Sequence, residues 1–347
     1  MKETQSLDEL KELIFSLCAA EGVAGQENGA AVCSEALLRR YTQEVYRSPL
    51  GSVIAMLGKG DRCLMLDAHL DQIGLIVTNL LERGFLRFSR CGGMDRRVLI
   101  GKPVVILGKK RVRGIVSSIP PHLAKAGDDK LPELEEMMID TGLTEEELKT
   151  LVAPGDRILV EAEPCCLMNN RIASPALDDR CSMAAILRCL ELLQGEELPC
   201  RLAVLFSVQE ETGGSGAKTG AFSVEPDEAI ALDVSFAQGP GVPESIVAKL
   251  GNGPLIGVSS TLSRTVSDTL EQLAKENELP YQLEVMGSAT GTNADHISNS
   301  RGGVATGLIS IAQRSMHTAV EIVSLEDVEA TAQLLAAYVR KGGACNG

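Results

Sequence analysis

Several apolar, strand-like runs of this chain end at, or within a few residues of, a histidine or an acidic side chain. The side chains placed in this way are His69, Glu210, Glu211, Asp233 and His317. Helical patterns lie between these runs, and strands that alternate with helices form a mainly parallel sheet with helices on both faces. The carboxyl ends of parallel strands meet at one edge of such a sheet, where ligands bind. We therefore expect an α/β fold that gathers these side chains at one edge.

Hydrophobic periodicity places the elements of this fold. Apolar residues at helical spacing predict helices over residues 7–17, 30–46, 183–193, 262–278 and 328–339. Short apolar runs predict strands over residues 52–57, 62–69, 201–208, 228–233 and 303–311. These elements make up a larger α/β unit formed by residues 1–71 and 166–347.

Between residues 72 and 165 the hydrophobic pattern of the sequence changes. Short β-type runs are separated by Gly and Pro, and they cover residues 75–80, 85–89, 103–107, 112–118 and 157–160. The Glu-rich stretch 133–149 predicts a solvated loop and a short helix. We interpret residues 72–165 as a small, β-rich, barrel-like domain inserted into the α/β unit. Because so small a domain has much apolar surface to cover, we expect it to carry self-association and to serve as a lid.

Composition limits the classes of function. The 347 residues carry a formal charge of −14, so nothing in the chain would neutralise the phosphates of a nucleic acid. The ten cysteines include no C-x-x-C pair, which in a chain of this length indicates reduced thiols and a cytoplasmic protein. No run approaches the ~18 consecutive apolar residues of a membrane-spanning helix. We expect no nucleic-acid partner and no membrane partner.

The side chains at the strand ends are those that bind divalent metal ions. Together with Asp178, which stands just before a predicted helix, two histidines and three carboxylates can hold two ions, and a further carboxylate can act on a water between them. Taken alone, Asp178 and Asp179 suit any helix start. Two consecutive carboxylates after an apolar run, Glu210 and Glu211, are costly without a cation or a pocket. The combination indicates a co-catalytic metallohydrolase.

The sequence resembles a known family, the tetrahedral or TET-type metallo-aminopeptidases, also described as deblocking or glutamyl aminopeptidases and historically labelled endoglucanases. The resemblance covers nearly the whole chain. It rests on segments 68–74 (AHLDQIG), 176–180 (ALDDR), 209–211 (QEE), 231–234 (ALDV) and 316–321 (MHTAVE), and on 120–123 (PPHL) and 301–304 (RGGV) outside the site. It implies a zinc-peptidase-like α/β fold and the removal of N-terminal residues from peptides.

The resemblance also implies a role for each site residue. The metal ligands would be His69, Asp178, Glu211, Asp233 and His317. Asp178 would bridge two ions, with His69 and Asp233 on one ion and Glu211 and His317 on the other. Glu210 would be the general base that takes a proton from water.

Asp71 would orient His69. The two residues lie on the same side of an extended chain, so Asp71 can hold the ring nitrogen that does not bind metal. Related two-metal peptidases have a cis peptide bond after the bridging aspartate, and we therefore predict one between Asp178 and Asp179.

The chain departs from the family at positions that are not ligands. Gln72 stands where the family usually has Glu, Ser182 where it usually has Gly, and Asn293 where Asp is common. The change at Asn293 bears on the substrate pocket. The glycines at 213, 214 and 216 suggest phosphate binding, but they miss the known nucleotide-binding spacings, and a tight turn beside Glu211 is the better interpretation.

Three functions fit these observations. The leading one is a two-metal aminopeptidase that acts on peptides, most simply with Zn²⁺, although Co²⁺ or Mn²⁺ suits the same ligands. The second is deacylation of N-acyl amino acids by the same metal chemistry. The third is an inactive, metal-binding assembly subunit, against which the presence of Glu210 argues, because a structural site needs no free base. The resemblance implies a homo-oligomer, from dimer to dodecamer.

Overall fold

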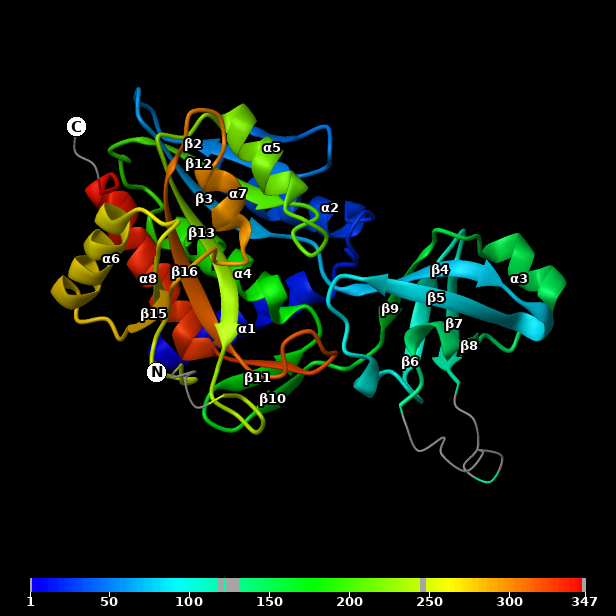
Figure 1. The fold of residues 1–347 in the computed structure, drawn as a ribbon. Coiled ribbons are helices and arrows are strands. Elements are labelled where there is room, and N and C mark those ends of the chain that lie inside the picture. Colours follow the sequence, from blue (N-terminus) through cyan, green and yellow to red (C-terminus); the bar gives the residue numbers. More distant parts are fainter. Residues whose placement is uncertain (1, 118–121, 123–130, 244–247, 345–347) are drawn as a thin grey trace.

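The computed structural model describes residues 2–117, 122, 131–243 and 248–344, with the side chains described from residue 6 onward. Figure 1 shows two parts, an α/β body and a smaller β-barrel beside it. Segment 120–123 of the sequence resemblance lies outside the described residues except for His122. No helix in the described ranges has both the length and the apolar character that crossing a bilayer requires.

The body is built on an eight-stranded sheet with a parallel centre. Its strands, in spatial order, are β1 (Val45–Arg47), β2 (Val53–Leu57), β12 (Arg201–Ser207), β3 (Cys63–His69), β13 (Glu228–Phe236), β16 (Ala305–Gln313), β14 (Leu255–Ser259) and β15 (Gln282–Met286). The four central strands, β12, β3, β13 and β16, run parallel, whereas β2 and β14 join them antiparallel. The predicted α/β class is confirmed, as a mixed sheet.

Helices cover both faces of this sheet. One face carries the larger group of helices, α1 (Lys2–Cys18), α2 (Asn28–Leu38), α4 (Leu177–Leu192), α6 (Arg264–Glu276) and α8 (Leu325–Lys341). The other face carries the shorter α5 (Ser215–Val224) and α7 (Asn293–Ser298). Strand β13 shows why, because its bulky Ile230 and Leu232 point to the larger group of helices and its small Ala229 and Ala231 point to the smaller one. By the same alternation, Asp233 points to the face of α5 and α7.

The predicted insertion forms a closed barrel. Its strands, in order around the barrel, are β4 (Gly74–Leu80), β5 (Phe85–Cys91), β8 (Ile139–Asp140), β7 (Arg111–Val116), β6 (Pro103–Leu107) and β9 (Arg157–Val160). In β7 buried and exposed residues alternate, so Val112 and Val116 enter the barrel core while the arginines face solvent. The Glu-rich stretch contains the expected short helix, α3 (Glu145–Leu151), but it also contains η4 (Leu134–Glu136) and β8, which was not predicted.

A small third sheet packs against the body. It consists of β10 (Cys165–Leu167), β11 (Arg171–Ser174) and β17 (Glu321–Ser324), and the sequence did not predict it. Short 3-10 turns occur at η1 (Glu82–Gly84) and η2 (Arg96–Val98). The predicted helix over residues 30–46 ends early, at Leu38, because Val45–Arg47 pairs with β2 as a strand.

Candidate metal centre

The parallel strands bring the predicted site residues to one edge of the sheet. His69 is the last residue of β3, and Glu210 and Glu211 follow the end of β12. Asp233 lies in the last part of β13, which continues to Phe236 and is longer than predicted, and His317 lies between β16 and β17. Because β12, β3, β13 and β16 are consecutive neighbours, these carboxyl ends are adjacent in space.

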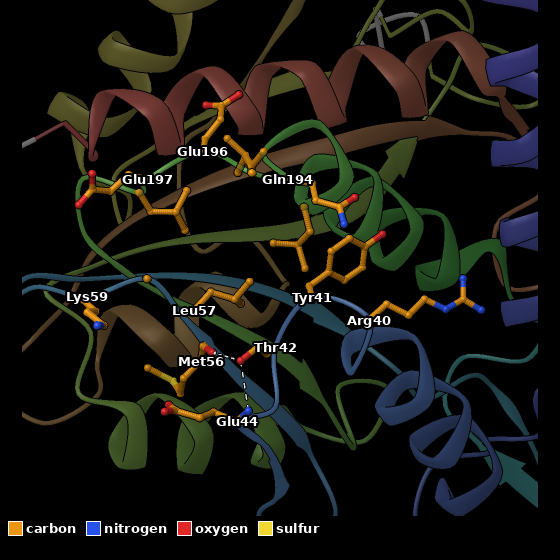
Figure 2. Close-up of a pocket in the computed structure, with 15 residues that line it drawn as sticks. Arg40, Tyr41, Thr42, Glu44, Met56, Leu57, Lys59, Gln194, Glu196 and Glu197 are labelled. Carbon is orange, nitrogen blue, oxygen red and sulfur yellow. Dashed lines mark hydrogen bonds between the residues drawn. The ribbon is translucent and has the colours of Figure 1, made fainter.

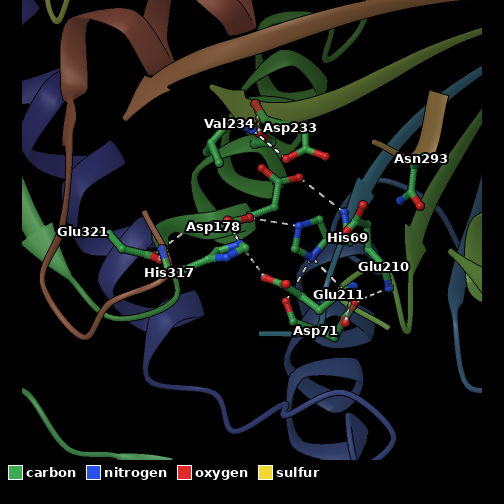
Figure 3. A network of polar contacts seen from close by, with 12 residues as sticks. His69, Asp71, Asp178, Glu210, Glu211, Asp233, Val234, Asn293, His317 and Glu321 are labelled. Atoms are coloured by element: carbon green, nitrogen blue, oxygen red, sulfur yellow. Dashed lines mark hydrogen bonds and ion pairs between the residues drawn. The ribbon is translucent and has the colours of Figure 1, made fainter. Parts of the chain in front are cut away.

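Asp178 lies at the centre of this cluster, between the two imidazoles (Figure 3). Its Oδ1 is 3.0 Å from Nε2 of His69, and its Oδ2 is 3.4 Å from Nε2 of His317. Nε2 of His317 is also 3.5 Å from Oε1 of Glu211. The two oxygens of one carboxylate therefore serve two separate histidines.

The ligand-type atoms fall into two groups that share Asp178. One group contains His69, Asp178 and Asp233, and the other contains Asp178, Glu211 and His317, with all ligand atoms of a group within 4.8 Å of one another. The carboxylate of Glu210 belongs to neither group. All of the sequence-predicted ligands are thus brought together, in the pairing that the resemblance implied.

Without a bound cation, burial and mutual repulsion make it unfavourable for these carboxyl groups to be ionised together. Burial, together with the charge of Asp178, raises the pKa of Glu211 to about 10. Burial and the charge of Glu210 raise the pKa of Asp233 well above its usual range. Burial alone would raise the pKa of Asp178 too, but hydrogen bonds from His317 and His69 lower it below its usual value.

These side chains fit divalent ions. Oε1 of Glu211 is buried and has no hydrogen-bond partner among the described residues, and a close polar neighbour is Nε2 of His317 at 3.5 Å, so this oxygen is suited to a cation. Mixed imidazole and carboxylate ligands are the set that zinc and its neighbours in the first transition row accept. Asp178, with one oxygen toward each group, has the form of a bridging ligand.

Asp71 lies against the ring nitrogen of His69 that faces away from Asp178, and it contacts the two glutamates as well. Nδ1 of His69 is 3.0 Å from the backbone oxygen of Asp71, whereas the nearer carboxylate oxygen is 3.6 Å away. The carboxylate also accepts hydrogen bonds from the backbone amides of Glu210, at 2.9 Å, and Glu211, at 3.1 Å. Asp71 therefore contacts His69 through both its backbone oxygen and its carboxylate, and the same carboxylate holds the backbone of the two glutamates.

Glu321 is a site residue whose position the sequence did not reveal. It is buried, and its carboxylate accepts hydrogen bonds from the backbone amides of Asp178 and His317. His317 has a φ of 60°, in the left-handed region that non-glycine residues rarely adopt, as do Ala176 and Gln209 beside the other ligands. The peptide bond between Asp178 and Asp179 is cis, as predicted, and Asp179 accepts a hydrogen bond from the backbone amide of His69.

Other sequence features lie outside the cluster. The glycines at 213 and 214 form the predicted tight turn, with Gly213 donating to the carbonyl of Glu210 and Gly214 to that of Gln209. His296 packs against Gly214 and is absent from both ligand groups, as is His122. Asn293 is fully buried and donates hydrogen bonds to Asp67 and Ser207 beneath the site.

A cavity of about 530 Å³ lies elsewhere on the body (Figure 2). Its lining includes Tyr41, Lys59 and Leu198, and a hydrogen bond from Thr42 to the carbonyl of Met56 closes one wall. Residues 59 and 198 come just before β3 and β12, so the cavity lies at the amino ends of the parallel strands. It is therefore at the opposite edge of the sheet from the ligand cluster.

The chain is similar to known proteins over nearly its whole length. A family model described as M42 glutamyl aminopeptidase matches residues 51–334. A lysyl aminopeptidase from Pyrococcus furiosus is 32% identical over 336 residues, which cover 95% of this chain and 96% of that protein. An aminopeptidase structure from the archaeon Desulfurococcus kamchatkensis aligns with a TM-score of 0.90 and 33% identity, over 96% of this chain and 95% of that one.

A further solved structure is of an assembly. The Pyrococcus horikoshii TET1 peptidase, described as able to assemble into a tetrahedron or a large octahedral shell, aligns with a TM-score of 0.84 and 28% identity. The alignment covers 95% of this chain and 99% of that one.

Proposed function

Because the chain belongs to the M42 glutamyl aminopeptidase family and is therefore an aminopeptidase, we propose that it uses two metal ions to remove N-terminal residues from peptides. The observation that carries this proposal is the pair of ligand groups that share Asp178. A shared carboxylate between two sets of ligands is the arrangement of co-catalytic metal sites.

The proposed ligands are the residues of the two groups. His69, Asp178 and Asp233 would hold one ion, and Asp178, Glu211 and His317 the other. When bound, such a pair of ions acidifies water and polarises the carbonyl of the scissile bond. Zn²⁺ is the first candidate, and Co²⁺ or Mn²⁺ is compatible with the same ligands.

Glu210 is the proposed general base. Its backbone is held by Asp71, and its carboxylate lies beside both groups without belonging to either. Burial raises the pKa of this carboxyl group above its usual value, toward the range in which a group both accepts and returns a proton near neutral pH. Glu210 would take a proton from the attacking water and deliver it to the leaving amine.

We also propose that the chain is a homo-oligomer assembled through its barrel. Structural relatives include a peptidase that can assemble into a tetrahedron or a large octahedral shell, and the barrel presents the apolar side chain of Ile115, which is 47% exposed, to solvent. Assembly with the sites facing an inner space would restrict substrates to peptides. The nine described cysteines are free thiols, which supports the expected cytoplasmic location. A strictly monomeric mass by light scattering, with metal present, would contradict the proposed assembly.

Assays on three substrate classes test the proposed function. Aminoacyl-chromophore, N-acetyl-amino-acid and cellulosic substrates should each be offered with added Zn²⁺, Co²⁺ or Mn²⁺. We expect turnover of the aminoacyl substrates alone. Faster turnover of the N-acetyl substrates would instead establish the deacylase alternative, and no turnover in a chain that holds two ions would indicate an inactive assembly subunit.

A further inference from the structure

A loop of the barrel lies directly against the proposed metal ligands of the body. Residues 91–95 connect β5 to η2, and the backbone amide of Asp95 donates a hydrogen bond to the carbonyl of His317 at 3.4 Å. Two glycines precede this contact. A Cβ at Gly93 would lie 2.3 Å from Nδ1 of His317, and one at Gly92 would lie 3.0 Å from Oε2 of Glu211.

These distances leave no room for a side chain. Because Cβ atoms essentially never approach another heavy atom within 3.0 Å, a side chain at position 93 would require the imidazole of His317 to move. Gly92 has a φ of 79°, so a side chain there would also strain the backbone. Gly93 lies outside the left-handed region, so a side chain there would cause no such strain. The conflict at position 93 is therefore steric, and it falls on the ring of His317.

The contact falls on the side of the ring that faces away from the other ligands. Nε2 of His317 points to Asp178 and Glu211, at 3.4 and 3.5 Å, while Nδ1 faces Gly93. The His317 side chain is 34% exposed, so less of the body encloses it than encloses His69, which is 1% exposed. The loop covers His317 on the side that the body leaves open.

We propose that the loop of residues 91–95 is a positioning element of the metal centre, which fixes His317 and Glu211 for one of the two ions. The inference rests on the proposed ligand assignment. The group that contains Glu211 and His317 is then completed by the inserted barrel, whereas the group that contains His69 and Asp233 is built by the body alone.

The test is the variant Gly93→Ala, with Gly302→Ala as its matched control, because a Cβ at Gly302 meets no atom within 4 Å and that residue has no positive φ. Metal content after dialysis against buffered Zn²⁺, and competition titration with a chromophoric chelator, report the two sites separately. We expect Gly93→Ala to weaken one site by about 10–100-fold, as loss of outer support for a ligand does. The other site of Gly93→Ala, and both sites of Gly302→Ala, should bind metal as tightly as the sites of the wild type do.

A double-mutant cycle distinguishes the loss of a contact that positions His317 from a general loss of structure. His317→Ala should lose the same site as Gly93→Ala, and adding Gly93→Ala to it should change the remaining site little. Wild-type affinity at both sites in Gly93→Ala, or equal loss at both, would overturn the inference. A wild-type chain that holds two ions but hydrolyses no aminoacyl substrate would overturn the proposed function and leave this inference standing.

Discussion

The carboxylate of Glu321 accepts a hydrogen bond from the backbone amide of Asp178 at 3.1 Å. Its second oxygen accepts one from the backbone amide of His317 at 3.0 Å. One buried side chain thus holds the backbones of two proposed ligands that are far apart in sequence. Because His317 has a left-handed backbone, which is unfavourable for a histidine, this hydrogen bond helps to maintain its conformation.

Glu321→Ala should therefore weaken both the fold around the site and metal binding. It leaves two buried amides without an acceptor, which costs about 2–4 kcal/mol in the free energy of unfolding. Urea unfolding of the metal-free protein measures this loss, and chelator competition measures the loss of metal affinity. The exposed control Glu146→Ala should change stability by less than ~0.5 kcal/mol. Equal stability of the two variants would contradict the role given to Glu321.

Glu210→Gln should leave both ions in place and remove most turnover. The amide has nearly the same shape as the carboxylate but cannot accept a proton, and loss of a general base costs about 10²–10⁴-fold in rate. The hydrogen bonds to Asp71 use the backbone amides and are unaffected by the change. The measurement is kcat on an aminoacyl-chromophore substrate, with metal content determined on the same sample. Near-normal kcat in a metal-replete sample would assign the proton transfer to another group.

Metal affinity should fall as the pH is lowered, and a chelator should abolish activity until metal is restored. Without ions, the pKa values of Glu211, Asp233 and His317 all lie above their usual values. These groups therefore hold protons to a higher pH than usual, and each proton must leave before the ion binds. Affinity should then rise about tenfold per pH unit for each proton released.

Chelator competition at pH 6, 7 and 8 measures this slope. Calorimetric titration in buffers of different ionisation enthalpy counts the released protons independently. A flat pH profile, or activity that persists in a chain shown by metal analysis to be free of ions, would refute the metal mechanism.

The sequence predicted which side chains gather at this edge of the sheet because their signals are local. His69 and the pair Glu210 and Glu211 directly follow apolar runs, and a strand that ends at a polar residue delivers that residue to the edge of a parallel sheet. The barrel was predictable for the same reason, since short runs of β-type residues between Gly and Pro identify strands one at a time.

Other features depend on tertiary contacts that leave no local signal. Glu321 is separated by 143 residues from Asp178, from whose amide it accepts a hydrogen bond, so the sequence shows only a glutamate at the start of a short strand. Gly93 looks like any loop glycine until His317 is placed beside it. The strands β14 and β15 at one end of the sheet were not predicted, and the six-residue helix α7 is too short for helical periodicity to distinguish it from a loop.

Asp71→Asn distinguishes two roles for Asp71. An asparagine keeps the backbone oxygen that contacts Nδ1 of His69, but its side chain offers only one acceptor to the two amides of Glu210 and Glu211. We therefore expect kcat to fall about 10–100-fold with little change in KM. The site that contains Glu211 and His317 should also lose more metal affinity than the site that contains His69. The exposed control Asp61→Asn should behave as the wild type. If affinity is lost only at the His69 site, then the side chain of Asp71 acts on the imidazole, as the sequence suggested, rather than on the glutamate pair.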